Sequence, residues 1–277
     1  MPTSQERARS VAWRLHREVV LLAGWGRAIL LQLAHPLVAQ GVADHSTFAD
    51  TRWGRATRLR RTLGAMLALT FGAPEESAAA VRAINHIHDR VHGRLVAEAG
   101  PIPAGARYSA HDPALLAWVH ATLVDTFLVT YERFVAPLTR EEQDRYCVEA
   151  AVAAPGLGIP DDMVPATADA LADYMERMLA SGDIVVTDTA RRLAADVLSL
   201  GLPAVVQPFI APARLPVVGM LPASIRAAYG FTWTRWHERA LHCMAAASRL
   251  VLPALPPILR YWPAARRAAD RESARSI

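Results

Sequence analysis

The chain has 277 residues, of which 52% are hydrophobic and 20% are charged, and its net charge at pH 7 is +4. A chain of this length can bury a substantial core, and its weak basic charge, without a stripe of basic and aromatic residues, argues against nucleic-acid binding. The two cysteines, Cys147 and Cys243, are too far apart for a metal-binding motif or a disulfide framework. We therefore expect a reducing compartment and a cytoplasmic protein.

The first predicted element is a buried helix over residues 13–34. Four residues interrupt the apolar run over residues 19–42, which disfavours a transmembrane helix: Arg27, Gln32, His35 and Pro36. Because proline removes a backbone donor, we expect the helix to break before Pro36. His35 lies at that break, either as a polar cap or as a residue that lines a cofactor pocket.

Residues 44–47 form a predicted loop, where Asp44 is either a helix cap or a base that takes a proton from a substrate. A helix follows, from about residue 55 to residue 71. Its i, i+3, i+4 spacing gathers four polar residues on one side: Arg55, Arg58, Arg61 and Thr62. Guanidinium groups beside a hydroxyl suit a carboxylate or a haem propionate, and the alternative is an ordinary solvated face.

The next predicted helix begins at Pro74 and ends near residue 97. Its apolar stripe has helical spacing: Val81, Ile84, His88, Val91 and Leu95. His88 therefore points inward, His86 faces water, and His92 lies one turn beyond His88 at the edge of the stripe. An inward histidine is either a hydrogen-bonded core residue or a ligand of a metal or haem iron.

After a predicted linker over residues 99–110, Asp112 and Pro113 begin a helix in which His120 shares an apolar stripe with its neighbours. His120 is the second candidate ligand, or a core histidine bonded to another helix. A capping box at Thr139 predicts one more helix, and two more follow at about residues 162–180 and 188–200.

Five prolines between residues 202 and 222 predict that this apolar segment is not a continuous helix. It is either a buried irregular crossing or an apolar lip that meets a lipophilic substrate or a membrane. The tail from residue 232 carries tryptophans and arginines and is a packed helix or one that lies on a membrane surface. Because strand alternation is absent, we predict an all-α protein. No hydrolase, di-iron, phosphate-loop or dinucleotide motif occurs, which argues against those chemistries.

Two motifs carry a family resemblance: Arg58-x-x-Arg61-Thr62, and His88 followed by Val91 and Gly93. Together they resemble the rubber oxygenase, or latex clearing protein-like, family, which also includes an oxygenase that cleaves the prenyl chain of a mycophenolic acid precursor. Three further segments are similar to its small bacterial branch: residues 31–36, 53–55 and 118–125. The resemblance extends from about residue 18 to about residue 230.

The resemblance implies an all-helical haem b protein with a globin-like core that cleaves carbon–carbon double bonds with dioxygen. It implies that His88 is the proximal ligand of the iron, and that Arg58 and Thr62 lie beside the haem. The latex-cleaving branch has an iron-ligating lysine at the position of Arg61, whereas all 30 basic residues of this chain are arginine. Arginine has no lone pair for a metal, so we expect an open distal site.

The sequence therefore predicts a single helical domain over residues 1–277, with a family-like core at about 18–230 and a C-terminal helix and basic tail at 231–277. The predicted function is haem- and dioxygen-dependent oxygenation of a small apolar, isoprenoid-like substrate. Arg58 and Arg61 would bind propionates or polarise dioxygen, Thr62 would donate a hydrogen bond, and His35 and His120 would line the pocket. The alternatives are a non-catalytic carrier of haem or lipophile, and a membrane-surface protein without a cofactor.

Overall fold

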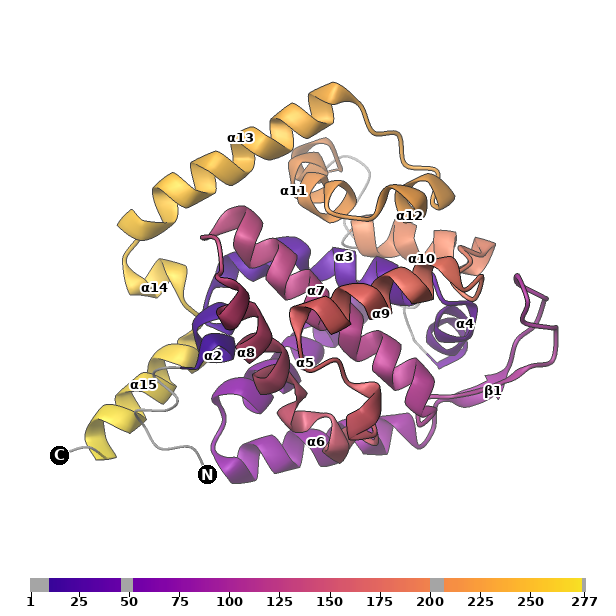
Figure 1. The fold of residues 1–277 in the computed structure, drawn as a ribbon, viewed down its shortest axis with the longest axis horizontal. Helices are drawn as coiled ribbons and strands as arrows, with labels where there is room; N and C mark the ends of the chain where they lie inside the picture. The colour runs from indigo at the N-terminus through magenta and orange to yellow at the C-terminus, as the bar shows by residue number, and fades with distance from the viewer. Residues whose placement is uncertain (1–9, 46–51, 200–206, 276–277) are drawn as a thin grey trace.

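The computed structural model describes residues 10–45, 52–199 and 207–275, and within these ranges it is helical apart from one two-stranded hairpin (Figure 1). The predicted all-α, single-domain fold is thereby confirmed. Helices α3 and α7 pack together in the middle of the molecule, and the remaining helices surround them. The α5–α6 pair lies on one side of this centre, and α13 lies on the other.

The N-terminal segment forms α2 (Val11–His16), a 3-10 turn (Val19–Leu21), α3 (Leu22–Leu33) and α4 (Pro36–His45). The prediction of one helix over residues 13–34 is wrong, because Glu18 adopts an extended backbone between α2 and the 3-10 turn. The carboxylate of Glu18 is fully buried and bound by the guanidinium of Arg260, which fixes this break. The chain also breaks at His35 as predicted, but Pro36 starts α4, which is bent by 105° from the helical segment before it.

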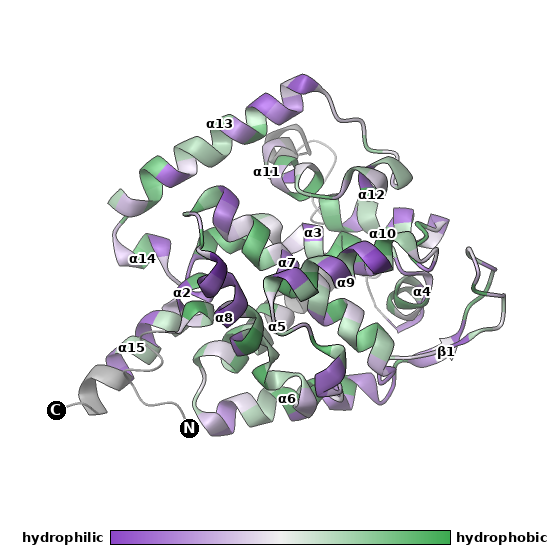
Figure 2. Ribbon diagram, viewed as in Figure 1, coloured by the Kyte–Doolittle hydropathy of each residue, from purple (hydrophilic) through white to green (hydrophobic). Residues whose placement is uncertain are grey.

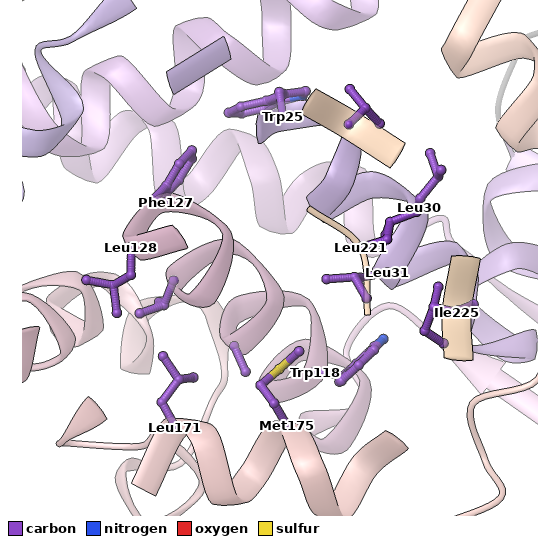
Figure 3. Close-up of a cluster of buried hydrophobic side chains, with 14 of the residues drawn as sticks. Trp25, Leu30, Leu31, Trp118, Phe127, Leu128, Leu171, Met175, Leu221 and Ile225 are labelled. Carbon is purple, nitrogen blue, oxygen red and sulfur yellow. The ribbon is translucent and has the colours of Figure 1, made fainter. Parts of the chain in front are cut away.

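The core of the molecule is the contact between α3 and α7 (Pro113–Phe134). Gly24 allows this approach, because a Cβ atom there would collide with the hydroxyl of Thr130. The largest buried cluster surrounds the two helices and receives side chains from α9 and α12 as well (Figure 3). By length and composition α7 resembles a membrane span, but 67% of its apolar window is buried inside the fold, as expected for a core helix.

A charged group lies inside this apolar centre. Arg27 is 4% exposed, and its guanidinium forms an ion pair of 2.7 Å with the carboxylate of Asp125. The same guanidinium donates hydrogen bonds to the hydroxyl of Thr126 and the carbonyl of Met220. The buried charge of Arg27 is therefore compensated by an ion pair and two hydrogen bonds. Through these contacts Arg27 connects α3 to α7 and to the end of α11.

Helices α5 (Arg52–Phe71) and α6 (Pro74–His88) form an antiparallel pair. Pro74 begins α6 as predicted, and the carboxylate of Glu76 accepts a hydrogen bond from the backbone N–H of Ala73. However, α6 ends at His88 and not near residue 97. The chain turns at Asp89 and Arg90, so His92 and Leu95 lie beyond the helix and not on its stripe.

The segment after α6 is a hairpin of β1 (His92–Arg94) and β2 (Arg107–Ser109), where the sequence predicted helix and then linker. Gly93 pairs with Tyr108 in this ladder. A Cβ atom at Gly93 would lie 2.5 Å from the phenol oxygen of Tyr108, so the pairing requires glycine at this position. Three-residue strands are too short for an alternating pattern to be recognised in the sequence.

The middle of the chain forms α8 (Arg140–Ala150), three 3-10 turns (Ala151–Ala153, Pro155–Leu157 and Asp161–Met163), α9 (Ala168–Ala180) and α10 (Asp188–Ser199). The capping box before α8 is confirmed: Thr139 Oγ1 accepts from the N–H of Glu142, and Glu142 accepts from the N–H of Thr139. The helix predicted from residue 162 begins later, because Thr167 supplies the hydroxyl that caps α9.

The C-terminal part forms α11 (Gln207–Gly219), α12 (Ala223–Ala228), α13 (Arg235–Val251), a 3-10 turn (Leu252–Ala254), α14 (Pro257–Arg260) and α15 (Pro263–Arg275). The segment with five prolines was predicted not to be a continuous helix, yet α11 occupies most of its described part and continues through Pro212 and Pro216. These prolines are four residues apart and share one helix face, so the missing backbone donors also fall on one side. Residues 200–206 lie outside the described ranges.

Candidate functional site

His88, the last residue of α6, has the features of an available ligand. It is half-buried, and its Nδ1 atom is shielded from solvent without a hydrogen-bond partner among the described residues. Burial lowers the pKa of His88, His111 lowers it further, and Asp89 opposes both effects. The imidazole is therefore neutral at pH 7 and keeps a lone pair on one ring nitrogen.

The helical phase predicted for α6 is confirmed at its two histidines. Val81, Ile84 and His88 are half-buried, whereas the side chain of His86 is 72% exposed. The predicted depth is wrong, because α6, all of whose residues are described, contains no fully buried residue. Its inward face therefore combines apolar side chains with a partly accessible imidazole, as a ligand-binding surface does.

The arginine-bearing helix packs against the helix that carries His88. Helices α5 and α6 are joined by the short connection at residues 72–73. At about 1.5 Å per residue, Arg58 and His88 each lie roughly 20 Å along their helix from that connection. Of Arg55, Arg58 and Arg61 the structure describes the helical backbone and not the side chains, and Thr62 is exposed at the surface of α5.

His35 is 6% exposed and caps the chain break between α3 and α4, which was one of the two predicted roles. Its Nδ1 accepts a hydrogen bond from the backbone N–H of Leu37 at 3.2 Å. Burial lowers the pKa of His35, and Asp183 and Asp112 oppose this effect. The neutral ring must then carry its proton on Nε2, which leaves neither nitrogen with a free lone pair.

His120 is half-buried on α7, and its Nε2 lies 3.2 Å from the carbonyl of Ala150 at the end of α8. Nε2 must donate to that carbonyl, so His120 joins α7 to α8 as a core histidine does. Burial lowers its pKa, and the hydrogen bond opposes the shift. Among the described residues, no hydrogen bond or ring contact joins His88 to His35 or His120.

The structure also brings His111 and Asp89 to His88, which the sequence analysis missed. The rings of His88 and His111 meet edge to face with centroids 5.8 Å apart. Nε2 of His111 lies 2.8 Å from a carboxylate oxygen of Asp89, the residue after His88. A turn after α6 and the start of α7 create this contact across 22 positions, so no helical spacing could have indicated it.

Asp44 occupies a fixed position at the base of the hairpin. Its two carboxylate oxygens accept hydrogen bonds from the phenol of Tyr108 and from the amide of Gln40. Burial and Asp44 together raise the pKa of Tyr108. A carboxylate with both oxygens occupied favours a structural role for Asp44 over a role as a base. The predicted role as a helix cap in a loop is wrong, because Asp44 lies in the last turn of α4. Beside it, a shallow hollow of about 500 Å³ lies along both strands and extends to Asp112.

Within the described ranges, no group of three or more His, Cys, Asp or Glu residues is arranged to hold a bare metal ion. The candidate ligand is therefore a single imidazole, that of His88. Haem needs one such protein ligand for its iron, cationic groups for its propionates and apolar side chains for its ring. The unpaired nitrogen of His88 and the apolar residues of α6 fit the first and the third of these needs.

Comparison with known proteins adds one match. The family model described as "ER-bound oxygenase mpaB/B'/Rubber oxygenase, catalytic domain" matches residues 13–250, most of the chain. No curated protein and no solved structure matches. The matched range contains α5 and α6 and ends at the last turn of α13.

Proposed function

This chain belongs to the mpaB/rubber oxygenase catalytic-domain family, and from that premise we propose that it is a haem b-dependent oxygenase of a small apolar substrate. The family is one of oxygenase catalytic domains, so dioxygen is the expected co-substrate. The observation that carries the proposal is the half-buried, neutral imidazole of His88 with its unpaired Nδ1.

In this proposal His88 would bind the iron, and neutrality at pH 7 would keep its lone pair available. Arg58 and Arg61 would bind the propionates from α5, because guanidinium groups form paired hydrogen bonds with carboxylates. Thr62, on the same helix, would donate a hydrogen bond to dioxygen. When bound, haem b supplies the iron that activates dioxygen for addition to a carbon–carbon double bond.

The proposed substrate is an apolar alkene of the isoprenoid class. Three of the half-buried side chains on the side of His88 are aliphatic, Val81, Ile84 and Val91, and the polar one, Asn85, donates its amide to the carbonyl of Gly156. Aliphatic side chains exclude water and bind hydrocarbon without directional contacts, which suits a prenyl chain better than a polar substrate. The polar residues of α5 would then act on dioxygen and haem, while the aliphatic residues hold the substrate.

The test is an optical spectrum of protein purified from haem-supplied cells. We expect a Soret band in the wild type and the loss of most of it in His88→Ala, because the iron loses its only protein ligand. His86→Ala is the matched control: it lies on the same helix, its side chain is 72% exposed, and its removal should leave the band unchanged. A colourless wild-type protein would refute the proposal.

A second measurement separates an oxygenase from a haem or lipophile carrier. Oxygen uptake is recorded with an isoprenoid alkene added to the haem-loaded protein, and His88→Ala is the negative control. Uptake that depends on both alkene and His88 supports the oxygenase. Haem binding without alkene-dependent uptake across short and long isoprenoids would assign the protein to the carrier class.

We propose a cytoplasmic location with contact to a membrane surface. Cys147 and Cys243 are both free, and Cys147 is buried, with its pKa raised by burial to about 11. Free thiols are typical of proteins in a reducing compartment. The description of the family includes "ER-bound", which supports membrane contact in the family.

A further inference from the structure

A corner of the molecule exposes large apolar side chains to solvent. Between the end of α13 and the end of α14, residues 250–259 contain no charged residue. Four of them are large and exposed, and we call them the apolar corner: Leu250 (80% exposed), Val251 (51%), Ile258 (64%) and Leu259 (64%). Figure 1 shows that α14 lies on the opposite side of the molecule from the β1 hairpin. The corner is therefore separate from the candidate haem site.

The outward face of α13 continues this corner. Leu241 and Ala245 bury the inner face of the helix against the core. On the opposite face, Trp236, Cys243 and Leu250 repeat every seven residues and are all exposed, with Trp236 at 76%. In Figure 2 the end of α13 next to α14 is coloured as hydrophobic. An ordinary surface helix has one apolar face, and exposed apolar side chains repeated on a second face beside the apolar corner indicate an interaction surface.

The positive charge of the protein is concentrated in the same segment. From residue 235 to the end, the chain contains eight arginines and three acidic residues, a net charge of +5, whereas the whole chain has +4. Glu238, the one acidic residue of α13, is bound by Arg133 and by the indole of Trp233, so its charge is compensated by Arg133. The outward face therefore presents arginines and apolar side chains without a compensating acid.

The apolar corner is held in place by a buried ion pair. The guanidinium of Arg260, at the end of α14, binds both carboxylate oxygens of Glu18, which is fully buried. The backbone N–H of Trp262 also donates to the carbonyl of Arg17. These contacts fix α14 on the N-terminal segment, so the exposed side chains are presented by a preorganised element and lose little entropy on binding.

We propose that the apolar corner and the outward face of α13 form a docking surface for an anionic lipid bilayer. Ile258 and Leu259 enter the boundary between headgroups and acyl chains, and Trp236 lies at headgroup level. Arg235 and Arg239 contact lipid phosphates, with the guanidinium of Arg239 over the ring of Trp236. A second copy of this chain is disfavoured as the partner, because two such surfaces would bring like charges together.

The test is co-sedimentation of full-length, haem-loaded protein with vesicles of equimolar phosphatidylcholine and phosphatidylserine, or of phosphatidylcholine alone. We expect the wild type to bind the anionic vesicles at least about tenfold more tightly than the neutral ones. The double substitution Ile258→Glu and Leu259→Glu should weaken binding to anionic vesicles by more than about tenfold. Arg235→Gln with Arg239→Gln should lower anionic binding by about tenfold and leave neutral binding unchanged.

Val152→Glu is the matched control, because Val152 is 81% exposed on a different element, and this variant should bind as the wild type does. Circular dichroism and the Soret band of each variant verify the fold. Three results would overturn the proposal: wild-type protein that ignores anionic vesicles, equal binding by the Ile258→Glu/Leu259→Glu and Val152→Glu variants, or a dimer without vesicle binding that the first variant dissociates. None of these results bears on the oxygenase proposal.

Discussion

The two helix pairs α3–α7 and α5–α6 differ in how completely they are covered, although their sequences are similar in pattern. Both α7 and α6 carry an apolar stripe that includes a histidine. In α7 the stripe residues Leu116 and Phe127 are buried, whereas no residue of α6 is. A stripe therefore predicts which side of a helix points inward, and the depth of burial depends on how many other elements pack over that side.

The buried polar groups of the two regions can be compared as well. In the centre, the guanidinium of Arg27 is bound by Asp125, Thr126 and Met220, and His120 is bound to α8. An unpaired ring nitrogen occurs in each region: Nδ1 of His88 on α6 and the indole Nε1 of Trp118 on α7. An imidazole can bind a metal, whereas an indole N–H can only donate a hydrogen bond. The unpaired group that fits the proposed haem site therefore belongs to the less covered pair.

The largest expected effect is on the free energy of unfolding of the central pair. Phe127 on α7 is 2% exposed and packs against Trp25 and His16. Phe127→Ala should destabilise the protein by about 4 kcal/mol, because it removes a buried ring and leaves a cavity. Ile87 on α6 is 55% exposed, so Ile87→Ala should change stability by less than about 0.5 kcal/mol. Urea unfolding measures both, and equal losses would contradict the proposed difference.

The second prediction concerns His16, which connects the two regions. Its Nδ1 lies 2.9 Å from the hydroxyl of Thr70 on α5, and its Nε2 lies 2.8 Å from the phenol oxygen of Tyr146 on α8. Burial lowers the pKa of His16 from 6.5 to about 4. Between these values the unfolded chain binds a proton that the folded protein does not, so stability is lost as the pH falls through this range.

Between pH 7 and pH 4 the free energy of unfolding should fall by about 3 kcal/mol, because each unit by which the pKa of His16 is lowered corresponds to about 1.4 kcal/mol. Urea midpoints measured between pH 7 and pH 4 should show it in the wild type. In His16→Gln this part of the pH dependence should disappear, since glutamine can bond to the same hydroxyls but does not titrate. His242→Gln, at a histidine whose side chain is 66% exposed, should follow the wild-type curve. Parallel curves for wild type and His16→Gln would exclude His16 as the titrating group.

The sequence allowed the all-α fold, several helix starts and the facing of α6 to be predicted, because each depends on local chemistry. Asp112 and Thr139 cap their helices as predicted, and His86 and His88 lie on the expected sides. The break at Glu18 could not be predicted, since the partner of its buried carboxylate, Arg260, is 242 positions away. The end of α6 was missed for a similar reason: the hairpin depends on a close fit between Gly93 and Tyr108.

The candidate site was predictable to the same extent. The position of His88 on an inward helix face followed from spacing, but the contact with His111 depends on a turn that spacing does not describe. His35 and His120 could not be assigned from sequence, because either role requires the partner atoms to be known. The structure supplies those atoms, Leu37 N–H and the carbonyl of Ala150, and both favour structural roles.

The smallest expected effect distinguishes His120 from His88. The distal side of the haem should be open, because the chain has no lysine and Arg61 offers no lone pair. His35 and His120 are the inward histidines that could cap the iron instead, but each is bonded to the backbone at a place away from α6: His35 at the start of α4 and His120 between α7 and α8. His120→Ala should therefore lower stability by about 1 kcal/mol, through its lost hydrogen bond, and leave the Soret band at the wild-type position.

Imidazole and cyanide should bind readily to the haem of wild type and variant alike. A low-spin bis-histidine spectrum in the resting wild type, abolished by His120→Ala or His35→Ala, would contradict this prediction and favour an electron carrier or haem-storage protein.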